Sequence, residues 1–142
     1  MTVNKSFIIG FDPGRDKCGL AVMDTNGHLY YHQVHITFSI ISMIQELLDQ
    51  FRFTLMVMGN QTTSHYWQQR LRTELSQLPP IVLVDERFTT LAARDRYWQM
   101  YPPKNWERLI PAGLRLIPRP VDDIAAIILI ERYLADLPMK RI

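Results

Sequence analysis

The sequence predicts an α/β fold in which a mixed sheet of about five strands has helices on both faces. Three strand-like apolar runs open the chain, and a turn that contains Asn26-Gly27, the strongest short-range signal for a hairpin, joins the last two. Two later apolar runs, Thr54 to Met58 and Ile81 to Val84, each follow a stretch with helical character. A three-strand antiparallel meander followed by parallel strands that helices connect is an α/β sheet.

The length of 142 residues fits a single domain over residues 1–142, and an apolar content of 47% is that of a globular protein. The longest apolar stretch, Ile124 to Ile130, is far shorter than the roughly 20 residues of a membrane span, so we expect no membrane role. The one cysteine and the absence of a signal-peptide pattern indicate a cytoplasmic protein. We expect a monomer or a weak homodimer.

The first half of the chain is expected to form the meander and one crossover. Apolar residues recur at helical spacing from Phe38 to Phe51, which predicts a helix. The continuously apolar run that follows and ends at Gly59 is typical of a buried parallel strand. The three meander strands are expected at Ser6 to Phe11, Cys18 to Met23 and His28 to Ile36.

The second half is expected to add two helices and a short core strand, with a helical insert between them. A helix from about Ser64 to Leu78 leads to the strand of Ile81 to Val84. Thr89 or Thr90 is expected to cap a helix that runs to about Tyr101. After a proline-broken region, an apolar helix from about Asp122 to Asp136 ends the layout, which is that of a ribonuclease H-like domain.

Acidic residues stand at the ends of two predicted core strands. Asp12 follows the first strand, and Asp85-Glu86 follow the strand of Ile81 to Val84. Because ligands of open α/β sheets gather at the carboxyl ends of strands, these carboxylates are expected to share one crevice. Grouped carboxylates require a cation, and Asp122-Asp123 at the start of the last helix would add a third ligand. Oxygen ligands from three elements suit Mg²⁺ or Mn²⁺.

Each of these acids also has a structural interpretation. Asp12-Pro13-Gly14 is good turn chemistry, and Asp122 or Asp123 would serve as a helix N-cap or first-turn acid. The small residues Ala125 and Ala126, one turn beyond Asp122, would let that helix approach the sheet closely. They favour Asp122 as the inward acid, with Asp123 as the alternative metal ligand.

Three separated motifs give the chain a resemblance to a known family. They are the strand-turn-strand GFDPGRDKCGLAVMD, with its Gly-x-Ala; VDERFTTLAAR, with Asp-Glu-Arg-x-Thr-Thr; and VDDIAAIILIERYL, with Asp-x-x-Ala-Ala. In order and spacing they resemble the YqgF-type family, also called RuvX-like or Holliday junction resolvases, of the ribonuclease H-like superfamily. Two stretches depart from its pattern: GNQTTSHYWQQR lacks the family's Gly-x-Pro, and RLIPAGLRLIPRP replaces a Lys-rich loop.

The resemblance implies a metal-dependent phosphodiesterase in which Asp12, Glu86 and Asp122 are the catalytic metal ligands. In such sites two Mg²⁺ or Mn²⁺ ions flank the scissile phosphate, where one activates water and the other stabilises the leaving oxygen. Contacts to the phosphates of nucleic acid are expected from Arg15, Lys17, Arg87, Thr89, Thr90 and Arg94. For Arg15 and Lys17, the alternative is that they are solvated side chains at the tip of a hairpin.

Three function classes remain open at this point. The first is a nuclease on structured RNA or branched DNA, with 5′-end processing of the small-subunit ribosomal RNA precursor favoured over Holliday junction resolution. The second is a nucleotide-binding domain, because the Asp-x-Gly hairpin also resembles the phosphate loop of actin-like ATPases. The third is a non-catalytic RNA- or ribosome-associated module that binds through the aromatic segment Arg87 to Arg119, which has seven Lys or Arg residues against two Asp or Glu.

Overall fold

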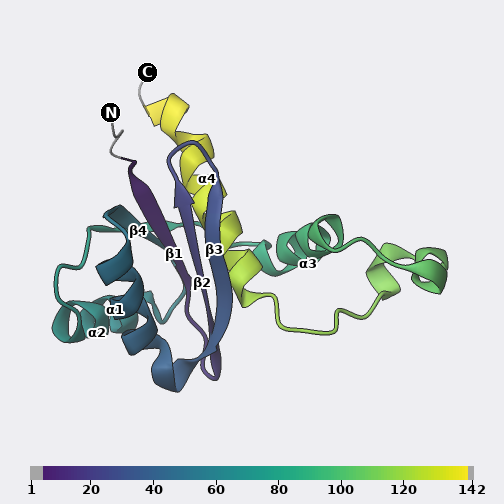
Figure 1. The fold of residues 1–142 in the computed structure, drawn as a ribbon, viewed down its shortest axis with the longest axis horizontal. Helices are drawn as coiled ribbons and strands as arrows, with labels where there is room; N and C mark the ends of the chain where they lie inside the picture. The colour runs from purple at the N-terminus through teal and green to yellow at the C-terminus, as the bar shows by residue number, and fades with distance from the viewer. Residues whose placement is uncertain (1–4, 141–142) are drawn as a thin grey trace.

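The computed structural model describes residues 5–140, and in this part of the chain a single five-stranded mixed sheet forms the centre of the fold (Figure 1). The strand order is β3-β2-β1-β4-β5. β1, β2 and β3 pair antiparallel as a meander, and β4 and β5 run parallel to β1. This is the expected α/β architecture. The strands are β1 Phe7–Asp12, β2 Lys17–Asp24, β3 Leu29–Ile36, β4 Phe53–Gly59 and β5 Ile81–Val84.

Helices cover both faces of the sheet. α1 (Ile40–Gln50) and α2 (Ser64–Glu74) pack on one face, and α4 (Asp122–Lys140) packs on the other. α3 (Thr89–Met100) packs against α4 and projects sideways from the sheet (Figure 1). In residues 5–140 no helix is both long and apolar enough to cross a membrane. Short 3₁₀ turns lie at Thr37–Ser39, Asn105–Leu109 and Ala112–Leu114.

β1 contributes side chains to the cores on both faces of the sheet. Ile9 and Phe11 face α1 and α2, whereas Ile8 faces α4, as expected from the period of two in a strand. On the α4 face, a Cβ atom on Gly10 would lie 2.6 Å from the carbonyl oxygen of Ala126. The small residue therefore lets α4 lie directly on the sheet, which brings the first turn of α4 close to the strand ends.

The structure corrects the expected helix ends in three places. α2 ends at Glu74 and not near Leu78, because the chain becomes extended at Leu75. α4 continues to Lys140, beyond Asp136. Neither Thr89 nor Thr90 caps α3. The N-cap is Phe88, which has the left-handed φ of 63°, and no side chain makes a capping hydrogen bond there. The Thr89 hydroxyl instead donates to the carbonyl of Glu86 at 2.9 Å.

Candidate active site

Asp12 ends β1 in the middle of the sheet, where it stands between two glycines on the neighbouring strands. Its partner on β2 is Gly19. On the other side, Gly59 ends β4 directly after Met58, which pairs with Phe11. Each glycine is the point at which another acidic residue approaches the sheet, so the sequence arranges three acids around the end of β1.

The first of these approaches brings Asp122 to Gly19. A Cβ atom at Gly19 would overlap the backbone carbonyl of Asp122, and it would lie 2.5 Å from the backbone nitrogen of Asp123. A residue without a side chain is therefore required under the first turn of α4. The close contact holds Asp122 beside the strand position that pairs with Asp12.

The second approach brings Glu86 to Gly59. A Cβ atom at Gly59 would lie 2.8 Å from Oε2 and 3.1 Å from Cβ of Glu86, so the Glu86 side chain lies over the end of β4. Two hydrogen bonds fix the turn that carries it, because the Thr89 backbone N–H and hydroxyl both donate to the Glu86 carbonyl, at 3.1 and 2.9 Å. Parallel pairing of β4 and β5 continues to Gly59 and Val84 and places this turn at the same sheet edge as Asp12.

Burial raises the pKa values of all three carboxylates, and at Asp12 the charges of the other two raise the pKa further. The pKa of Asp12 is raised to about 7, first by burial and then by the charges of Asp122 and Glu86. Burial raises the pKa of Glu86, with a further contribution from the charge of Asp85. Burial also raises the pKa of Asp122. Among the described residues no Lys, Arg or His forms an ion pair with Asp12, Glu86 or Asp122.

The chemistry of this group fits a divalent cation. Ionised carboxylates that lack a basic partner repel one another, and a bound cation removes that repulsion. Their hard oxygen atoms are the ligands that Mg²⁺ and Mn²⁺ prefer. In residues 5–140 no three His, Cys, Asp or Glu side chains are close enough to enclose one ion. The structure therefore shows three carboxylates that approach the end of β1 but do not by themselves enclose an ion.

Asp123, the alternative metal ligand, lies in a separate network. Its side chain is 2% exposed, and its Oδ2 is 2.7 Å from Nδ1 of His32. Arg119 donates to both carboxylate oxygens at 3.1 Å. Burial acts to raise the pKa of Asp123, but the hydrogen bonds from Arg119 and His32 lower it overall. Since these contacts occupy both oxygens, the acid of α4 that faces Asp12 is Asp122.

Four of the residues expected to contact phosphate remain available to a ligand. Arg15 is exposed at the hairpin tip, where its ion-pair partner is the equally exposed Asp16 at 3.8 Å. Lys17 is exposed at the start of β2, near enough to Asp122 for its charge to lower the pKa of that carboxyl in part. Arg87 is exposed and pairs with Asp85 at 3.1 Å. Thr90 is exposed in the first turn of α3.

The other two expected contacts are used inside the protein. Thr89 is buried, and its hydroxyl holds the turn of Glu86. Arg94 donates to the carbonyl of Arg115 at 3.3 Å and so ties α3 to the segment that leads into α4. Thr89 therefore supports the turn that carries Glu86, whereas Arg94 links two segments of the protein outside the group of acids.

The cluster of His32, Arg119 and Asp123 was not predicted from the sequence, because His32 is far from the other two residues in the chain. One local signal was present, since Arg119 stands four residues before Asp123, the spacing of a helical ion pair. The contact with His32 on β3 comes only from the way in which α4 crosses the sheet.

Comparison with known proteins shows the family and the fold of the chain. A family model described as RuvX, Holliday junction resolvase, matches residues 6–136. The structure of Thermus thermophilus RuvC is similar, with 17% identity, a TM-score of 0.62, and coverage of 94% of this chain and 96% of that one. T. thermophilus RuvC in complex with a Holliday junction substrate matches with 20% identity, a TM-score of 0.52, and coverage of 92% and 95%. No individual curated protein matches the chain. The structural matches confirm the expected ribonuclease H-like fold.

Proposed function

Because the chain belongs to the RuvX Holliday junction resolvase family, we propose that it is a metal-dependent nuclease that hydrolyses phosphodiester bonds of structured nucleic acid. The observation that carries this proposal is the convergence of Asp12, Glu86 and Asp122 around two glycine positions. A purely structural set of acids would be expected to pair with basic side chains, as Asp123 does.

In this proposal Asp12, Glu86 and Asp122 hold Mg²⁺ or Mn²⁺. Two such ions, when bound, supply an activated water and stabilise the charge that develops on the phosphate and the leaving oxygen. The three carboxylates act as ligands in their ionised form, so Asp12 must lose its proton when metal binds. Lys17 and Arg15 stand at the same end of the sheet, where they contact the phosphates beside the scissile one.

We propose branched DNA as the substrate class. The membership in a Holliday junction resolvase family and the solved RuvC complex with a Holliday junction substrate support this choice. Processing of the 5′ end of the small-subunit ribosomal RNA precursor, which the sequence analysis favoured, remains a second prediction and is tested with the same protein preparation.

The testing experiment compares cleavage of four-way DNA junctions and of precursor ribosomal RNA fragments, each with Mg²⁺ or Mn²⁺. Wild type is set beside Asp12→Asn and Glu86→Gln, and Asp49→Asn on the exposed side of α1 is the matched control. We expect junction cleavage by wild type and the control, with loss of at least about 100-fold in the two site variants. Cleavage that survives both site substitutions would refute the proposed site. Saturable ATP binding without cleavage of either substrate would support the nucleotide-binding alternative.

A further inference from the structure

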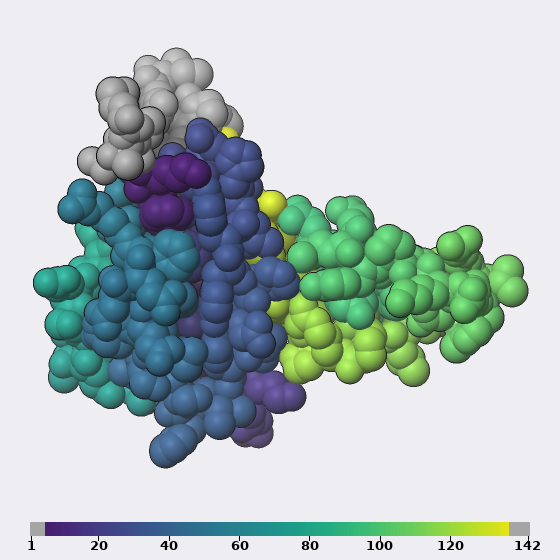
Figure 2. All heavy atoms as spheres, in the orientation of Figure 1, coloured from purple at the N-terminus to yellow at the C-terminus, as the bar shows by residue number. Residues whose placement is uncertain are grey.

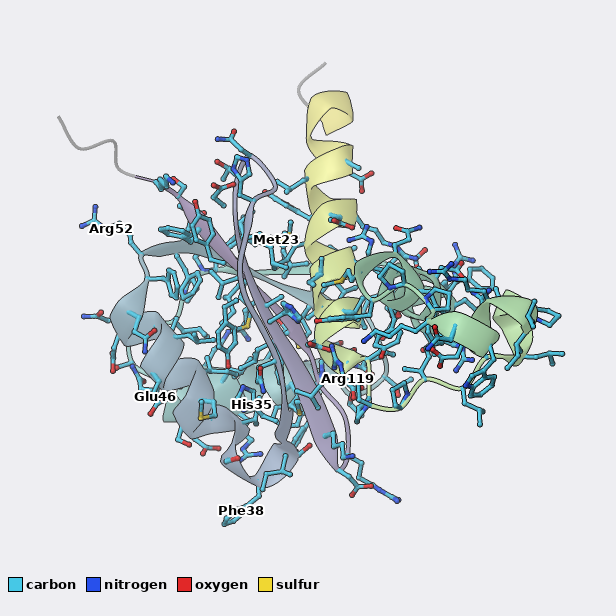
Figure 3. All side chains as sticks on the ribbon, turned by 45° about the vertical axis from the view of Figure 1, so that its right-hand side comes forward. Met23, His35, Phe38, Glu46, Arg52 and Arg119 are labelled. Carbon is cyan, nitrogen blue, oxygen red and sulfur yellow. The ribbon has the colours of Figure 1, made fainter. Side chains whose placement is uncertain are left out.

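A cavity of about 450 Å³ lies beside β3, immediately next to the proposed active site. Asp122 and Asp123 are consecutive in α4, and whereas Asp122 faces the acids, Asp123 lies in the wall of this cavity. Lys17 and Arg119 also line it, and Tyr101 closes the side toward α3. Figure 3 shows Arg119 beside the first turn of α4.

The Arg119 guanidinium in this cavity is held in place by hydrogen bonds and by aromatic rings. The buried carboxylate of Asp123 accepts two hydrogen bonds from Arg119, and the carbonyl of Pro120 accepts a third. The Arg119 guanidinium lies over the rings of Tyr97 and Tyr101, 5.8 Å from each centroid. A guanidinium with its orientation fixed loses little conformational freedom when it binds an anion. Lys17 and Arg119 together carry one positive charge more than Asp123 balances, so the cavity favours a phosphate group.

Tyr101 also lines a second cavity of about 450 Å³, at the point where α3 meets the connection to α4. Trp98 and Pro102 contribute apolar walls, and Lys104 and Glu107 add one charge of each sign. The guanidinium of Arg115 lies over the Trp98 ring at 5.7 Å from its centroid. In Figure 2 these segments form a lobe that stands out beside the sheet. Aromatic side chains next to cations are the usual environment for an unpaired base.

We propose that the two cavities form one path for an unpaired nucleic-acid strand that continues from the cleaved bond. A phosphate occupies the first cavity, against Lys17 and Arg119, and a base occupies the second, against Tyr101 and Trp98. This inference rests on the proposed nuclease function and narrows it to substrates with an unpaired segment beside the scissile phosphate. A base in a duplex is stacked and paired, so its face is not free for an aromatic side chain.

The test measures binding by fluorescence anisotropy in EDTA, where metal-dependent cleavage cannot occur. The probes are a single-stranded DNA of about 12 nucleotides, a length that single-strand binding domains cover, and the blunt duplex of the same sequence. Tyr101→Leu and Lys104→Gln alter exposed side chains of the second cavity, and Tyr101→Phe retains the ring. The matched controls are Tyr66→Leu and Arg52→Gln, both exposed and outside the two cavities.

We expect Tyr101→Leu to weaken single-strand binding about tenfold, the loss of one stacked base, and Lys104→Gln to weaken it about threefold. Tyr101→Phe and both controls are expected to bind as wild type, and duplex binding is expected to change less than about twofold. Unchanged single-strand binding in Tyr101→Leu, or an equal loss for the duplex, would overturn the inference. Full competition by millimolar AMP would assign the cavities to a free nucleotide and would also overturn it.

The outcomes of this test and of the cleavage assay are separable. A protein that binds the single strand through Tyr101 but cleaves neither nucleic acid loses the proposed function, whereas the binding path stands as a measured property. A protein whose Tyr101→Leu variant cleaves junctions and binds single strands as wild type keeps the proposed function and loses the path.

Discussion

Gly19 of β2 lies so close under α4 that a Cβ atom at this position would overlap the backbone carbonyl of Asp122. The position of the third acid therefore depends on the absence of a side chain in a different element. Because Gly19 pairs with Asp12 across the meander, this contact also sets how the two carboxylates lie toward each other.

Gly19→Ala is expected to lower the free energy of unfolding by about 2–3 kcal/mol, because the added methyl group meets backbone that cannot move without shifting the whole helix. Urea unfolding measures the change. Gly113→Ala is the matched control, since a Cβ atom at Gly113 would meet nothing within 4 Å. Equal stability of Gly19→Ala and Gly113→Ala would contradict the close contact between α4 and β2.

Gly59→Ala is expected to weaken Mn²⁺ binding while it changes the free energy of unfolding only slightly. Its added Cβ atom would meet the Glu86 side chain at 2.8 Å, and a flexible carboxylate can move away at a cost below about 1 kcal/mol. The displaced Glu86 would no longer converge on Asp12, so Mn²⁺ affinity is expected to fall about tenfold. Calorimetric Mn²⁺ titration beside urea unfolding tests both statements. A large loss of stability with unchanged Mn²⁺ affinity would show that Glu86 is not a ligand.

The metal-free protein is expected to lose stability as the pH rises from about 4 to about 7. The pKa of Asp12 is about 7 in the folded state, well above its value in an unfolded chain, so over this range the unfolded state ionises more readily. The effect amounts to about 2–4 kcal/mol, and Asp12→Asn is expected to remove most of it. Urea unfolding in EDTA across this pH range is the measurement. If the stability of the wild type rose with pH in parallel with that of Asp12→Asn, the result would contradict the raised pKa of Asp12.

Asp24 is expected to have the opposite pH dependence. Burial acts to raise its pKa, but hydrogen bonds from the backbone N–H groups of His28 and Asn26 and from the Tyr30 hydroxyl lower it to about 2. Its stabilising contribution is therefore present above about pH 4 and is lost as the pH falls toward 2. Asp24→Asn is expected to cost about 1–2 kcal/mol near neutral pH and much less at acidic pH. A cost that is equal at both pH values would disprove this role.

The sheet and the strand-end acids were predictable because their signals are local. The Asn26-Gly27 turn and the apolar runs on either side of it specify a hairpin through contacts within a few residues. Asp12 ends β1 and Glu86 follows the end of β5 by two residues, so the parallel pairing that brings these strands together through β4 also brings the acids together.

The network around Asp123 and the start of α3 were not predictable from the sequence, because they depend on the conformation of the folded chain. His32 meets Asp123 only after α4 has crossed β3, and the two residues are 91 positions apart in the chain. Thr89 was expected to cap a helix and to contact phosphate. The left-handed conformation of Phe88 instead turns the chain so that the Thr89 hydroxyl reaches the Glu86 carbonyl.

Calorimetric titration of Mn²⁺ into wild type and Asp12→Asn at about pH 7 tests the central claim most directly, because it reports on the carboxylates without requiring the right nucleic acid. Buffers of different ionisation enthalpy count the protons released. We predict saturable binding by wild type with release of about half a proton from Asp12, which is about half protonated at this pH, and a loss of affinity of at least about tenfold in Asp12→Asn. Equal Mn²⁺ affinity in the two proteins would contradict the assignment of Asp12, Glu86 and Asp122 as a metal site.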